Sequence, residues 1–171
     1  LIFGSQITFY AFLFAPIVLV MIISSKINSL SASMASFLFF VYSAVTGVTL
    51  SAIFLMYTQE SIATTFGITA GTFGATALFG YVTKKDLSKM GSILFMLLIG
   101  LIIASVVNMF LKNDTMMWIL TYVGIVIFVG LTAYDMQKLK KIAHSIDDDE
   151  SSIAKFAVLG ALTLYLDFIN L

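Results

Sequence analysis

The chain contains no cysteine and no arginine, and its 171 residues include a single proline. The lack of cysteine excludes disulfides, thiol catalysis and zinc–sulfur sites. Charge is also scarce, because 11% of the residues are charged, against about 25% in a soluble domain. Nine lysines balance nine acidic residues, so no net charge attracts the chain to nucleic acid, and we expect no such partner.

Apolar residues, in contrast, make up 60% of the sequence, and the mean hydropathy is +1.06. A transmembrane helix needs about 20 mostly apolar residues. Stretches of this kind cover residues 1–25, 34–56, 61–83, 90–111, 116–137 and 156–171. We therefore predict an all-α, polytopic transmembrane helix bundle, with residues 1–171 as a single domain in the lipid bilayer. The first stretch begins at residue 1 and the last is short, so six spans are visible and seven are expected in the full-length protein.

The lysines predict how the bundle is oriented. Alternation of the six spans places eight of the nine lysines on one side and Lys112 alone on the other. Lysine-rich loops normally face the cytoplasm. The eight are Lys26, Lys84, Lys85, Lys89, Lys138, Lys140, Lys141 and Lys155.

Two carboxylates interrupt the apolar spans, Asp135 and Asp167. Ionisable groups inside a membrane are costly, so each is a candidate functional residue. Two neighbouring carboxyls do not readily ionise together and titrate as a coupled unit, and their oxygens can bind a hard cation. The alternative is that each Asp only joins neighbouring helices by hydrogen bonds.

Other polar or small residues in the spans have simpler interpretations. Thr163, Asp167 and Asn170 are spaced i, i+4 and i+7, which places them on one face of the last helix. That face suits a water-lined path, although Thr163 and Asn170 could equally serve interhelical hydrogen bonding. Gly67 and Gly71 predict close helix packing. The loop around residues 145–154 is acidic, and we interpret it as solvated.

Three segments together resemble the Bax inhibitor motif family of membrane proteins. They are GTFGATALFGYVTKKDLS (71–88), GLTAYDMQKLK (130–140) and LYLDFINL (164–171), and SAVTGVTL (43–50) fits the same pattern. The resemblance runs from about residue 35 to the end of the chain. The Tyr-Asp pair of the penultimate helix and the Leu-Tyr-Leu-Asp-Phe-Ile-Asn run of the last are the most specific part.

The resemblance implies a helical bundle that leaks calcium down its gradient in a pH-dependent way, in a bacterial cytoplasmic membrane. It implies that Asp135 and Asp167 form a hydrogen-bonded pH sensor at the pore and hold Ca²⁺ transiently, with protons and Ca²⁺ as partners and no bound cofactor. Thr163, Asn170 and Tyr134 are candidates for lining or supporting this pathway. A relative latches its aspartates with an arginine; this chain has none, and Lys26 is the nearest substitute.

Two other functions compete with the channel. Intramembrane aspartyl proteases also pair two aspartates, but they place Gly-x-Gly before the second one and Pro-Ala-Leu after it. Here the second Asp follows Leu164-Tyr165-Leu166, and the only proline is Pro16, so we expect no enzyme. The remaining alternative is a non-channel interaction protein that modulates a membrane protease or a stress or cell-death pathway, with residues 145–154 as the candidate docking segment.

Overall fold

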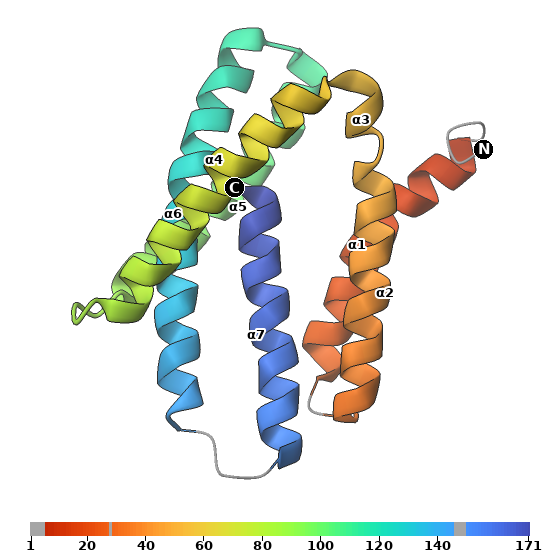
Figure 1. Cartoon of the computed structure of the whole chain (residues 1–171). Helices are drawn as coiled ribbons and strands as arrows, with labels where there is room; N and C mark the ends of the chain where they lie inside the picture. The colour runs from red at the N-terminus through yellow and green to blue at the C-terminus, as the bar shows by residue number, and fades with distance from the viewer. Residues whose placement is uncertain (1–5, 28, 146–149) are drawn as a thin grey trace. The chain divides into compact units, whose positions relative to one another are not determined.

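The structure is a computed structural model that describes residues 6–27, 29–145 and 150–171. In this part of the chain all regular structure is α-helical, which confirms the predicted class. Figure 1 traces the helices in chain order. They are α1 Gln6–Lys26, α2 Ala32–Leu50, α3 Ile53–Met56, α4 Gln59–Val82, α5 Ser88–Leu111, α6 Asp114–Ala143 and α7 Glu150–Asn170.

Five of the described helical segments are long and apolar enough to cross a membrane: Ala32–Met56, Gln59–Val82, Ser88–Leu111, Asp114–Ala143 and Ser152–Asn170. They correspond to the last five predicted spans. The first predicted span is represented by a shorter apolar segment, Phe14–Lys26, and residues 1–5 lie outside the described part. Large apolar side chains are widely exposed, including Leu55 at 78% and Phe110 at 76%. Lipid rather than water suits such a surface.

Helix ends differ from the predicted spans where polar groups stabilise additional turns. α6 begins at the Asn113 cap, whose side-chain oxygen accepts a hydrogen bond from the Met116 N–H at 2.9 Å, and it continues to Ala143 with lysines in its last turn. Cations at a helix C-terminus and acids at an N-terminus favour the helix dipole. The same effect fits the start of α7 at Glu150 rather than near residue 156.

The second predicted span is interrupted between α2 and α3. The Ser51 hydroxyl donates to the Val48 carbonyl at 2.6 Å, and the Thr46 hydroxyl donates to the Tyr42 carbonyl at 2.9 Å. Such bonds from Ser and Thr side chains to the preceding turn compete with helical hydrogen bonds and bend helices.

The chain folds as two compact units. Unit 1 spans Leu1–Thr65 and Ile146–Leu162. In it α1 and α2 are in contact, and its buried residues include Ile23, Ala35 and Tyr42, each at most 3% exposed. The prediction of a single domain remains a prediction.

Unit 2 spans Phe66–Ser145 and Thr163–Leu171, so it holds most of α4, all of α5 and α6, and the end of α7. α5 and α6 lie side by side as an antiparallel hairpin (Figure 1). Leu94, Ile127 and Leu131 form the buried cluster between them, with Met90, Leu98, Leu101 and Phe128 packed around it. Both intramembrane aspartates belong to this unit.

Candidate functional site

Asp135 projects from a stretch of α6 that two other helices contact closely. A Cβ atom at Gly80 of α4 would overlap the carbonyl oxygen of Ala133, and one at Gly91 of α5 would lie 2.5 Å from the Tyr134 ring. Both glycines therefore let a neighbouring helix approach α6 directly before Asp135. These contacts fix the rotation of α6 about its axis, and with it the direction in which Asp135 points.

Asp167 lies on the part of α7 that belongs to unit 2. The next residue, Phe168, places its ring edge-on to Phe66 and Phe73 of α4, at centroid distances of 5.6 and 5.5 Å. Such edge-to-face pairs are the favoured aromatic geometry. They anchor the end of α7, and Asp167 beside them is only 5% exposed.

The two aspartates line one cavity of about 590 Å³ between α5, α6 and α7. Most of its wall consists of Leu, Ile, Val and Phe side chains. Its polar lining residues are Ser105, Asp135, Thr163, Asp167 and Asn170. The structure thus brings the last four, which the sequence had marked as candidates, to one cavity; their shared role stays a prediction.

Within the described residues, the Oδ2 atom of Asp167 is buried and has no hydrogen-bond partner. Buried polar atoms nearly always have a partner, because an unsatisfied one costs about 1–3 kcal/mol. The cavity is wide enough for several water molecules, each of which occupies roughly 30 Å³ in the liquid. This oxygen is therefore available to a proton, a water molecule or a cation that enters the cavity.

The described residues contain no cluster of three or more His, Cys, Asp or Glu side chains that could hold a metal ion. A calcium ion takes six to eight oxygen ligands, and this cavity offers two carboxylates with one threonine, one serine and one asparagine side chain. These are oxygen-bearing side chains of the kind that hard cations prefer.

The other predicted residues lie in different surroundings. Tyr134 packs against Gly91 beside the cavity, and the Lys138 ammonium lies 5.9 Å from the centre of its ring. Asn170 lines the cavity and donates to the Leu166 carbonyl at 2.8 Å. Lys26 ends α1 in unit 1, so its role as a latch stays a prediction. The docking segment 145–154 falls partly on residues 146–149, outside the described residues.

Gln137 is a site residue that sequence reasoning missed. Its side-chain oxygen accepts from the Leu87 N–H at 2.9 Å, and its side-chain nitrogen donates to the Lys85 carbonyl at 2.8 Å. The side chain is 6% exposed. It thus clamps the α4–α5 loop to α6 two residues beyond Asp135. An amide residue at the very end of an apolar span was the available signal.

Two lysines strengthen this attachment at the same end of unit 2. Lys140 donates to the Tyr81 carbonyl at 2.8 Å, and Lys141 forms an ion pair with Asp86 at 2.7 Å. The Lys141 ammonium, with help from the Ser88 hydroxyl and N–H, lowers the pKa of Asp86 from 3.8 to about 2. Gln137, Lys140 and Lys141 therefore close the lysine-rich end of unit 2 around the α4–α5 loop.

Comparison with known proteins identifies the family. The family model described as inhibitor of apoptosis-promoting Bax1 matches residues 1–171. The chain belongs to this Bax inhibitor family. The inner membrane protein YbhL of Escherichia coli K12 is 53% identical over 172 residues, which cover 100% of this chain and 74% of that protein. An uncharacterized protein of Borreliella burgdorferi is 49% identical, over 100% of this chain and 74% of its own length. An uncharacterized protein of Rickettsia prowazekii is 45% identical, over 93% of this chain and 67% of its own length.

Family membership confirms the resemblance inferred from the aspartate motifs. Together with the apolar helices, it establishes this Bax inhibitor family protein as an integral, multi-pass membrane protein.

Proposed function

We propose that this protein is a pH-sensitive calcium leak channel in which Asp135 and Asp167 form the pH-responsive gate. The observation that carries the proposal is the shared cavity: both intramembrane carboxylates line it, and Oδ2 of Asp167 is buried there without a partner among the described residues. A membrane protein does not keep two costly carboxyl groups together without compensation. Conduction would supply a reason for this pair.

The mechanism follows from the charge of the pair. When both carboxyls are ionised, the cavity carries negative charge in a medium of low dielectric and attracts a cation strongly. When the two share a proton, they hydrogen-bond to each other and that attraction falls. Protons thus compete with Ca²⁺ for the same oxygens, so pH controls the charge of the cavity.

We place the channel in a bacterial cytoplasmic membrane with its lysine-rich loops on the cytoplasmic side. The charge asymmetry of the loops supports this orientation, and the E. coli relative is named an inner membrane protein. The proposed partners are Ca²⁺, protons and the lipid bilayer, with no resident cofactor.

Calcium entry into proteoliposomes between about pH 5 and 8, the range in which such switches operate, tests the proposal. The parent chain is compared with Asp135→Asn and Asp167→Asn. Glu60→Gln is the matched control, because it removes an exposed carboxylate at the start of α4 that does not line the cavity. We expect a pH-dependent flux that both aspartate variants flatten and the control retains.

Two results would contradict the proposal. One is a pH profile unchanged by either aspartate substitution. The other is no flux at any pH from folded protein, which would favour the non-channel role as an interaction protein that modulates a membrane protease or a stress pathway.

A further inference from the structure

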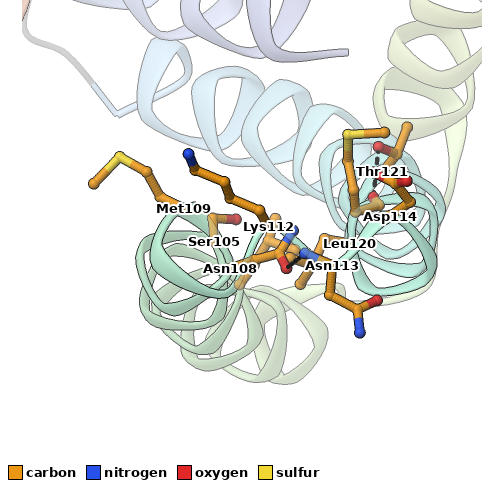
Figure 2. Close-up of a pocket in the computed structure, with 10 residues that line it drawn as sticks. Ser105, Asn108, Met109, Lys112, Asn113, Asp114, Leu120 and Thr121 are labelled. Atoms are coloured by element: carbon orange, nitrogen blue, oxygen red, sulfur yellow. Dashed lines mark hydrogen bonds between the residues drawn. The ribbon is translucent and has the colours of Figure 1, made fainter.

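A second cavity lies at the other end of unit 2, where α5 turns into α6. It measures about 560 Å³, and Figure 2 shows Ser105, Asn108 and Lys112 on its α5 side and Thr121 on its α6 side. Asn113 and Asp114 lie at the turn itself. This end carries Lys112, the lysine that the sequence places opposite the lysine-rich loops.

The second cavity adjoins the aspartate cavity, because Leu101 and Ser105 line both of them. Leu101, Ser105, Asn108 and Lys112 follow one another at spacings of four, three and four residues, which is the repeat of one helix face. Along this face α5 changes from apolar at Leu101 to polar at Ser105, Asn108 and Lys112. One continuous helix face therefore connects the α5–α6 turn to the two carboxyl groups.

At the opposite end of unit 2 the described residues form a separate cavity. The cavity there, lined by Lys84, Lys85, Gln137, Lys140, Lys141 and neighbouring loop residues, shares no lining residue with the aspartate cavity. The Gln137 clamp and the Lys141–Asp86 ion pair hold the α4–α5 loop across that end. The Oδ2 atom of Asp167 is buried without a hydrogen-bond partner among the described residues, and a water molecule in the aspartate cavity would supply one.

We infer that water and cations reach Asp135 and Asp167 from the Lys112 end of unit 2, along the Asn108–Ser105 face of α5, with Leu101 as the apolar constriction before the aspartate cavity. The passage of cations rests on the proposed channel function, whereas the passage of water does not. Apolar constrictions gate conduction by excluding water. The Leu101 side chain would lie 3.4 Å from a Cβ atom at Gly124 of α6, so little room separates the two helices there.

The chain has no cysteine of its own, so single cysteines can report which positions water reaches. Ser105→Cys and Asn108→Cys are placed in otherwise unchanged protein in oriented membrane vesicles. Each is treated with a positively charged, membrane-impermeant methanethiosulfonate reagent. Val107→Cys is the matched control, because Val107 lies at the same depth of α5, is 44% exposed and lines neither cavity. Lys84→Cys and Asp114→Cys mark the two faces of the membrane.

We expect the reagent to modify the thiols at positions 105 and 108 from the Asp114 face of the membrane. Their modification should be on the order of tenfold or more faster than that of the thiol at position 107, because thiolate is the reactive form and a thiol surrounded by lipid does not ionise. Rates equal to that of the control, or modification only from the Lys84 face, would overturn the inference. Asn108 also accepts from the Asn113 N–H at 3.1 Å. Should Asn108→Cys fail to fold, Ser105→Cys decides the result alone.

Calcium flux before and after modification separates this inference from the channel proposal. Blocked flux in modified Ser105→Cys, and increased flux in Leu101→Ala, support the route for cations. Modification without any effect on flux would overturn the cation route and leave only a water path. Modification in a protein that conducts at no pH would contradict the channel proposal while retaining the water path.

Discussion

Replacement of Gln137 by methionine tests the clamp that closes the lysine-rich end of unit 2. Methionine keeps the length of the side chain and removes both of its hydrogen bonds, to the Leu87 N–H and to the Lys85 carbonyl. Each bond contributes about 1 kcal/mol, and a buried donor left without a partner costs about 1–3 kcal/mol. Because Leu87 is 7% exposed, we expect Gln137→Met to lower the free energy of unfolding by about 2–3 kcal/mol.

Thermal unfolding in detergent measures this loss. For a chain of this size, 1 kcal/mol corresponds to a change of roughly 2–4 °C in Tm, so the expected decrease is about 5–10 °C. Gln137→Glu retains the acceptor for Leu87 and loses the donor to Lys85, so it should lie between the parent chain and Gln137→Met. The control Gln59→Met alters an exposed glutamine at the start of α4. If Gln137→Met melts with the parent chain and the control, the clamp reasoning is refuted.

Three further predictions are each tested by thermal unfolding. Gly80→Ala pushes a methyl group against a backbone carbonyl of α6 and should destabilise the protein by about 1–3 kcal/mol. The control Gly71→Ala meets no described atom within 4 Å and should be neutral or stabilising. Equal effects of the two substitutions would contradict the packing of Gly80 against α6. Lys112 has a left-handed φ of 50°, so Lys112→Gly should gain up to about 1 kcal/mol, and a loss would show that the lysine side chain outweighs backbone strain. The pKa of Asp86 is lowered to about 2, so its ion pair with Lys141 contributes stability above pH 3.8 that is lost as pH falls toward 2. The Tm difference between the parent chain and Asp86→Asn should therefore be present at neutral pH, shrink over that interval and weaken in salt; a difference that persists at pH 2 would contradict this.

Sequence alone was sufficient for the helical class and for the approximate positions of the spans, because lipid demands long apolar helices. It also marked Asp135 and Asp167 as candidate residues, since a carboxyl group inside an apolar span is conspicuous. That the two aspartates share a cavity could be expected only from the resemblance of the α6 and α7 motifs to the family. The residues themselves do not tell which helix faces meet, because this depends on packing over the whole unit.

The glycines show why packing was harder to predict. Gly67 and Gly71 have the spacing of a close helix contact, yet a Cβ atom at either would meet no described atom within 4 Å. On α4 the close contact is made instead by Gly80, which is not part of this glycine pair. Gln137 escaped attention for a similar reason, because its partners are backbone groups about 50 residues earlier in the chain, and backbone groups leave no mark in a sequence.

We propose that Asp135 and Asp167 act as one titrating unit that controls calcium flux. The most direct measurement is the pH dependence of calcium entry into proteoliposomes for Asp135→Asn, Asp167→Asn and the double variant. Groups that act as a unit give non-additive effects, so each single variant should flatten the profile as completely as the double variant does. Two independent effects that add in the double variant, or a pH response that survives in it, would contradict the account.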